Sequence, residues 1–133
     1  MVNLQEDLML ARVVRNRSRC ESSKYAVGAV LKTKNGERYC GCNIENDGLQ
    51  SICAERVAFA KAISDGETEF ERILIIGGKQ GTEDFEKCLP CGYCRQFISQ
   101  FVDDDFKVYT AYEDKVEEYT IGELFPNQFH LDN

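Results

Sequence analysis

The chain of 133 residues has the length of one domain, and its 43% hydrophobic and 29% charged residues are ordinary for a folded protein. A net charge of −7 with scattered lysines and arginines argues against a nucleic-acid partner, because a polynucleotide surface needs clustered basic side chains. No apolar run approaches the length of a membrane span, and no basic region precedes a long apolar stretch at the N-terminus, so we expect no membrane partner and a cytoplasmic location.

The predicted elements follow one another without a linker or a repeat. Asn3 and Glu6 have the spacing of a capping box at the start of the first helix, and Leu4, Leu8 and Ala11 share one of its faces. The order of elements predicts one domain, residues 1–133, with an α/β fold and a mixed sheet of about five strands. In chain order we expect a helix over 3–14, strands over 24–33 and 37–43, a helix over 52–64, a strand over 72–78, a helix over 91–101, strands over 106–112 and 116–121, and a short helical turn before Pro126.

Seven cysteines, an odd number, argue against a framework of disulfides. Cys53 and Cys91 begin predicted helices, and Cys91 forms a C-x-x-C pair with Cys94 in "PCGYC". The pair alone is compatible with a redox site, half of a zinc ribbon or a catalytic zinc site. Cys88 lengthens the motif to "CLPCGYC", but the fourth cysteine and the following proline of an iron–sulfur run are absent.

Cys53, Cys91 and Cys94 together supply three thiolates from two helix starts. Three protein ligands leave one position of a tetrahedral zinc open, as in catalytic sites, and bound zinc lowers the pKa of water to about 7. Arg56 and Arg95 each neighbour a ligand, and we expect them to offset the excess negative charge by hydrogen bonding to the thiolates.

Glu55 follows Cys53 by two residues, in the first turn of the predicted helix. By itself it would be only a favourable charge at a helix N-terminus. Together with the three cysteines it is predicted to carry a proton between the zinc-activated water and a substrate nitrogen.

Two motifs in this order, "CAE" and then "PCGYC", resemble the signature of the zinc deaminases, with Cys53 in place of the histidine that some members use. The segments "SKYAVGAVL", "GCNIEN", "CAERVAFAKAISDGETEF", "PCGYCRQ" and "LFPNQF" are similar to the small cytidine deaminases, over nearly the whole chain. The resemblance implies a three-layer α/β/α fold and hydrolytic deamination of cytidine or deoxycytidine to uridine or deoxyuridine, in pyrimidine salvage. It also implies one Zn²⁺ per chain on Cys53, Cys91 and Cys94, with Glu55 as the proton shuttle.

The resemblance further implies a nucleoside site that neighbouring subunits of a homotetramer share. Asn43 and Glu45 match positions that hydrogen-bond the sugar hydroxyls, and an amide and a carboxylate at alternate positions of a strand end can both reach a polyol. Tyr25 falls where the family usually has a phenylalanine against the nucleoside, and Ala54 would offer backbone groups to the pyrimidine edge. Phe129 matches an aromatic that reaches the base in an adjacent subunit; for Tyr25 and Phe129, core packing is the alternative. No basic cluster suits a substrate phosphate, which favours nucleosides over nucleotides.

The segment over 46–53, "NDGLQSIC", departs from the family pattern because it is one residue shorter and lacks the usual aromatic. Ser22 also stands where an aromatic is usual. An alternative substrate is therefore another aminated heterocycle or a modified nucleoside, as in the related blasticidin S deaminases. A third hypothesis, a non-catalytic zinc or thiol-redox module built on Cys88 and the C-x-x-C pair, explains neither Glu55 nor "NIEN".

Overall fold

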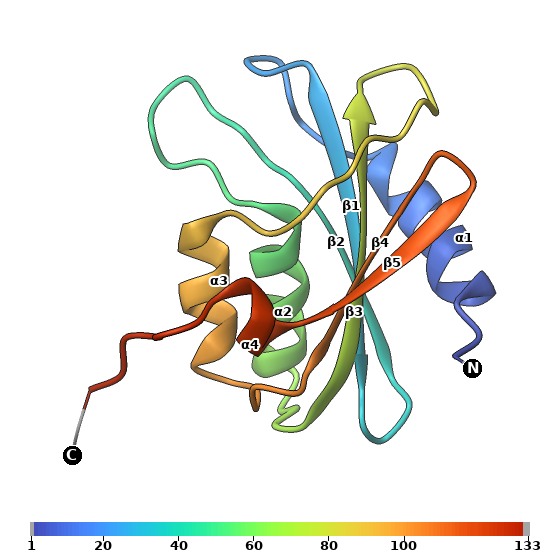
Figure 1. Ribbon diagram of the computed structural model, residues 1–133. Helices are drawn as coiled ribbons and strands as arrows, with labels where there is room; N and C mark the ends of the chain where they lie inside the picture. Colours follow the sequence, from blue (N-terminus) through green and yellow to red (C-terminus); the bar gives the residue numbers. More distant parts are fainter. Residues whose placement is uncertain (1, 132–133) are drawn as a thin grey trace.

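The computed structural model describes residues 2–131, so residues 1 and 132–133 of the predicted domain lie outside the described part. Its five-stranded sheet has the order β2-β1-β3-β4-β5, with β3 and β4 parallel and the other neighbours antiparallel. Figure 1 shows α1 on one face of the sheet and α2, α3 and α4 on the other, which confirms the three-layer α/β/α fold. The elements are α1 (Gln5–Arg15), β1 (Tyr25–Thr33), β2 (Arg38–Cys42), α2 (Ala54–Ser64), β3 (Phe70–Lys79), α3 (Gly92–Ser99), β4 (Lys107–Tyr112), β5 (Lys115–Thr120) and α4 (Ile121–Leu124).

The central strand β3 is buried on both faces, as its continuous apolar run predicts. Successive side chains of a strand point to opposite faces of the sheet. Ile73 and Ile75 accordingly belong to the core beneath α2 and α3, while Leu74 and Ile76 belong to the core beneath α1. The sheet therefore separates two apolar cores and supports helices on both sides.

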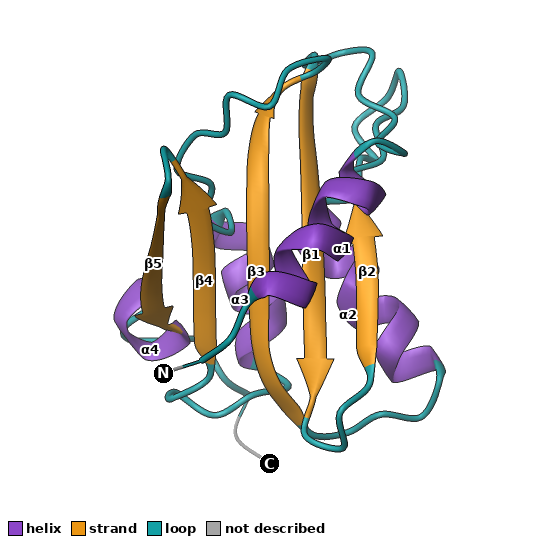
Figure 2. Ribbon diagram, turned by 90° about the vertical axis from the view of Figure 1, so that its right-hand side faces the viewer, coloured by secondary structure: helices purple, strands orange, loops and turns teal. Residues whose placement is uncertain are grey.

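The apolar face of α1 packs on the sheet as predicted, and Figure 2 shows the helix lying over β1, β2 and β3. The predicted capping box is wrong. The helix begins at Gln5, whose backbone N–H donates to Asn3 Oδ1 (3.0 Å), and Glu6 instead accepts from Arg38 Nη1 on β2 (2.7 Å). An ion pair between α1 and β2 thus occupies the side chain that the capping box required.

Helices α2 and α3 begin at cysteines, as predicted. Cys53 and Cys91 are extended residues that immediately precede α2 and α3. Ile52, which was expected inside the helix, lies before it and exchanges backbone hydrogen bonds with Ile44 (both 2.9 Å). Within residues 2–131, no helix combines the length and the apolar character that a membrane crossing requires.

Candidate active site

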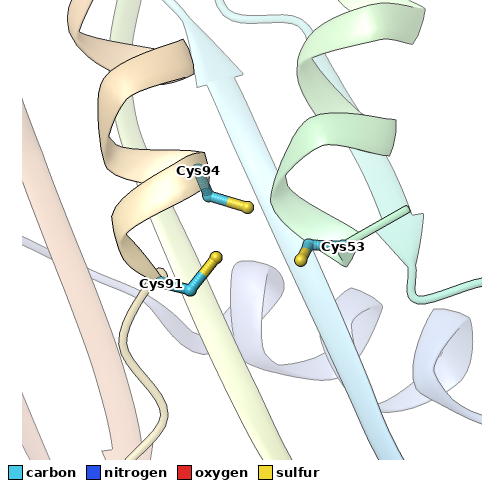
Figure 3. Close-up of side chains that lie close together, drawn as sticks. All are labelled: Cys53, Cys91 and Cys94. Atoms are coloured by element: carbon cyan, nitrogen blue, oxygen red, sulfur yellow. The ribbon is translucent and has the colours of Figure 1, made fainter. Parts of the chain in front are cut away.

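The three cysteines predicted as zinc ligands meet between the starts of α2 and α3. Their Sγ atoms lie within 4.8 Å of one another, and Figure 3 shows the sulfurs pointing toward the same space. Zinc–sulfur bonds of about 2.3 Å put the sulfurs of a tetrahedral site roughly 3.8 Å apart, so the cluster fits one zinc ion after a small adjustment. Among the described residues Cys88 is not a member of this cluster, which therefore offers three thiolates and leaves a fourth position for another ligand.

The surroundings of Cys53 favour its thiolate form. The Cys94 thiol donates to Cys53 and the Arg56 guanidinium lies beside it, and together they lower the pKa of Cys53 to about 5 against the opposing effect of burial. The same hydrogen bond raises the pKa of Cys94. The N-termini of α2 and α3 add partial positive charge near the sulfurs. Three thiols beside a cation and two helix starts form a donor set suited to zinc.

Glu55 lies in the first turn of α2 and is 4% exposed. Burial raises the pKa of its carboxyl to about 7, and the negative charge of Cys53 adds to this effect. Its own backbone N–H donates to the carboxylate and opposes the shift. A carboxyl with a pKa near 7 can both accept and donate a proton at neutral pH, as a proton carrier must.

The two arginines expected around the thiolates have different partners. The charge of Arg56 stabilises the thiolates, while its Nη2 donates to Ser51 O (3.0 Å). Arg95 instead donates from Nε to Pro90 O and from Nη1 to Leu124 O, both at 2.6 Å. These carbonyls use two of its five N–H groups, and no hydrogen bond joins Arg95 to a sulfur among the described residues. Arg95 thus corrects the expectation from sequence: it ties the segment before α3 to α4.

Asn43, expected to bind the sugar, is buried and held by three hydrogen bonds. Its Oδ1 accepts from Val27 N (2.9 Å) and from the Ser18 hydroxyl, and its Nδ2 donates to Tyr25 O (2.8 Å). The amide has two N–H groups, and the second one faces Glu45, where it helps to lower the pKa of that carboxyl.

Glu45, its expected companion, is held by Ser23. The Ser23 hydroxyl donates to Oε2 (2.6 Å) and its backbone N–H donates to Oε1 (3.0 Å), which lowers the pKa of Glu45. The carboxylate is therefore charged and oriented at neutral pH. The supporting role of this serine was missed from the sequence, because its contact crosses from one segment to another.

Tyr25 begins β1 and packs with Cys88 over Gly77. A Cβ added to Gly77 would lie 2.8 Å from Cys88 Sγ and 3.0 Å from Tyr25 Cε2, so only glycine leaves room for both side chains. Burial raises the pKa of both Tyr25 and Cys88 to about 12, and the charge of Glu55 also contributes for Cys88. Cys88 is thus a neutral thiol that lies near Glu55. The sequence suggested Cys88 only as a member of a zinc or thiol-redox module with the C-x-x-C pair, whereas the cluster among the described residues consists of Cys53, Cys91 and Cys94.

Ala54 and Phe129 take very different positions. Ala54 is fully buried at the first position of α2, where a backbone N–H has no partner within the helix. Phe129 is 63% exposed, while its backbone carbonyl accepts from Gln96 Nε2 (3.0 Å) and Gln100 Nε2 (3.1 Å) on α3. The backbone of Phe129 is therefore anchored and its ring lies outside its own core.

A metal-binding set of three thiolates beside a buried carboxyl, on an α/β/α scaffold, is typical of a zinc-dependent hydrolytic enzyme. Comparisons with known proteins agree with this class. A family described as the cytidine and deoxycytidylate deaminase zinc-binding region matches residues 1–110. A cytidine deaminase of Sporosarcina psychrophila is 40% identical over 109 residues, which are 80% of this chain and 76% of that protein.

Two further comparisons extend over nearly the whole chain. A blasticidin-S deaminase of Bacillus cereus is 33% identical over 131 residues, 94% of this chain and 93% of that protein. The crystal structure of cytidine deaminase from Burkholderia pseudomallei matches with a TM-score of 0.84 and 28% identity, covering 96% of this chain and 100% of that one. The chain belongs to the cytidine and deoxycytidylate deaminase family. The resemblance predicted from the motifs is thereby confirmed, together with the fold, the enzyme class and the zinc cofactor.

Proposed function

We propose that this chain, acting as one domain over residues 1–133, deaminates cytidine, deoxycytidine or both in cytoplasmic pyrimidine salvage. The observation that carries the proposal is the convergence of Cys53, Cys91 and Cys94 beside the buried Glu55. The three cysteines would hold one zinc ion, which supplies an activated water molecule when bound. The products are ammonia and the corresponding uracil nucleoside.

Glu55 moves the proton in this reaction. It accepts one proton from the water that attacks C4 of the cytosine ring and delivers it to N3. It then transfers the second proton of that water to the amino group, which leaves C4 as ammonia. Its burial supports this role, because it separates the carboxyl from bulk water that would compete for the proton.

The sugar is bound by the second N–H of Asn43 and the carboxylate of Glu45. An N–H donor and a carboxylate acceptor match a pair of sugar hydroxyls, one accepting and one donating. Support for this role comes from the hydrogen bonds of Ser18 and Ser23, which fix both side chains before a ligand arrives.

The base is bound by Tyr25, by the free backbone N–H of Ala54 and by Phe129 from a neighbouring subunit of a homotetramer. One protomer leaves the site open, since Cys91 is exposed and the Phe129 ring projects from its own core. An exposed aromatic side chain of this kind is suited to complete a site across a subunit interface.

Glu55→Gln tests the mechanism. The substitution preserves the shape of the side chain and removes its ability to take up a proton, so we expect one zinc per chain and a loss of cytidine turnover of about 10²-fold or more. Metal analysis and the change in ultraviolet absorbance on deamination measure the two quantities. Normal turnover by this variant would show that another group carries the proton.

A second candidate, with the same chemistry on a different substrate, is deamination of blasticidin S or a modified nucleoside. It is favoured by the full-length similarity to the Bacillus cereus blasticidin-S deaminase and by the shortened segment over 46–53. In this segment Leu49 is completely exposed, and the backbone bonds between Ile44 and Ile52 close a loop next to Asn43.

A substrate panel separates the two candidates. We expect kcat/KM for cytidine or deoxycytidine to exceed the values for blasticidin S, guanine and modified cytidines by about 10²-fold, because the proposed role of Asn43 and Glu45 is to bind a sugar, and hydrogen bonds within the protein hold both side chains in place. Faster turnover of blasticidin S would favour the second candidate and leave the zinc mechanism intact.

A further inference from the structure

Arg56 and Tyr93 form a contact next to the zinc ligands that the proposed mechanism does not use. Tyr93 lies at the second position of α3, between Cys91 and Cys94, and its side chain is 70% exposed. Arg56 lies in the first turn of α2, next to Cys53. The Arg56 guanidinium carbon is 4.6 Å from the centroid of the Tyr93 ring. A guanidinium within about 6 Å of an aromatic centroid is attracted by the ring's π face.

The position of the Arg56 guanidinium depends on few other contacts. Its Nη2 donates to Ser51 O, but its Nε is buried and has no hydrogen-bond partner among the described residues. The same guanidinium interacts with the sulfurs of Cys53 and Cys94 by hydrogen bonding and by its charge. Apart from its interactions with the sulfurs, this long and flexible side chain has one hydrogen bond to a backbone carbonyl, and the Tyr93 ring supplies a second restraint that keeps it beside them.

The ring also changes the environment of the charge. The Tyr93 ring covers one face of the guanidinium and shields that face from water, and a charge interaction is stronger where water is excluded. Three thiolates around one divalent zinc carry an excess negative charge, which a neighbouring cation reduces. We propose that Tyr93 is a positioning residue that holds Arg56 against the zinc-binding thiolates and thereby strengthens zinc binding by this chain.

The proposal rests on the proposed zinc site, and zinc affinity tests it without reference to activity. Competition with a chromogenic chelator gives the zinc Kd of each variant. We expect Tyr93→Ala to weaken zinc binding about 3- to 10-fold, because a partly exposed cation–π contact and a residue behind the ligands have effects of this size. Tyr93→Phe keeps the ring and should bind zinc like the unchanged chain.

The control is Tyr112→Ala. Tyr112 contacts Lys115 in a similar way (4.7 Å), on the β4–β5 hairpin, and its loss should leave the zinc Kd unchanged. Because Tyr93 is proposed to act through Arg56, adding Tyr93→Ala to Arg56→Gln should cause no further loss. Thermal unfolding and light scattering verify that each variant folds and keeps the same oligomeric state.

Three results would overturn the proposal. They are an unchanged zinc Kd in Tyr93→Ala, an equal loss in Tyr93→Phe, or an undiminished effect of Tyr93→Ala in the Arg56→Gln background. In each case normal zinc binding by the unchanged chain would leave the proposed function standing. Failure of the unchanged chain to bind zinc would overturn the zinc site itself and the role of Tyr93 with it.

Discussion

Asp7 shows how one buried carboxylate connects three elements. It is fully buried on α1, and it accepts from Arg72 Nε on β3 (2.9 Å) and from Arg38 Nε on β2 (2.9 Å). Arg72 is itself buried, so its charge depends on protein partners and not on water. The carboxylate thus secures α1 to the two strands beneath it.

Asp7→Ala should destabilise the fold by about 3 kcal/mol, the lower end of the range for breaking a buried ion pair. The lower end applies because Arg72 keeps Glu71 (2.6 Å) and Arg38 keeps Glu6 (2.7 Å). Urea denaturation measures the free energy of unfolding.

Glu21→Ala is the matched control for this prediction. Glu21 pairs with Lys24 at 3.4 Å, but the two side chains are 83% and 59% exposed, so water replaces the lost interaction. The free energy of unfolding should remain almost unchanged. Equal losses in the Asp7 and Glu21 variants would contradict the structural role of burial at Asp7.

The start of α2 depends on the close approach of this helix to β2. A Cβ at Gly41 would overlap the carbonyl oxygen of Ala54 and lie 2.7 Å from the backbone nitrogen of Ala58. Both atoms belong to the α2 backbone and cannot move unless the helix moves. Because Cys53 directly precedes this helix, the glycine of β2 determines where one zinc ligand lies.

Gly41→Ala should therefore lower both stability and zinc content. We expect a loss of about 1–3 kcal/mol in the free energy of unfolding, typical of an overpacked contact, and less than one zinc per chain. Gly92→Ala is the control, because nothing lies within 4 Å of its added Cβ and alanine is the better helix former. Unfolding and metal analysis measure both effects, and full zinc content in Gly41→Ala would refute the dependence.

A shared active site can be tested by mixing defective subunits. If Phe129 completes the site of a neighbouring subunit, Glu55→Gln and Phe129→Ala impair two different parts of each site. Assembly of the two variants in equal amounts should restore the wild-type combination in about a quarter of the sites. Cytidine turnover of the mixture should then exceed the sum of the separate variants.

Light scattering of the unchanged chain provides the companion measurement, with a mass of four chains expected. A mixture that is no more active than its separate parts would show that Phe129 does not act between subunits. The exposure of its ring, with its backbone anchored to α3, is the reason for expecting that it does.

Contacts that span a single helical turn could be predicted from the sequence. Cys53 and Glu55 lie in one such turn, as do Cys91 and Cys94, and both turns begin where the motifs indicated. The α/β order and the burial of β3 also followed from local patterns of apolar residues. These features depend on residues that are close together in the sequence, so a short segment is enough to predict them.

The hydrogen-bond partners of the arginine side chains could be identified only from the tertiary structure. Arg15 illustrates this point, since it donates to the carbonyls of Ala26, Gly78, Lys79 and Thr82, which belong to β1, β3 and the loop after β3. The antiparallel register of β1 and β3 brings these carbonyls together at one end of the sheet. No pattern within α1 indicates which strand ends will lie beneath it.

The sequence by itself determined the α/β class and the cysteine cluster that can hold zinc, and it predicted Glu55 as the proton carrier, because their spacing is local and their chemistry is specific. Only the tertiary structure decided that Arg95 binds the carbonyl of Leu124, that Cys88 lies beside Tyr25, and that Tyr93 covers Arg56. These contacts join segments that are distant in the chain. Strand register and helix packing bring such segments together, and neither is encoded in any single segment.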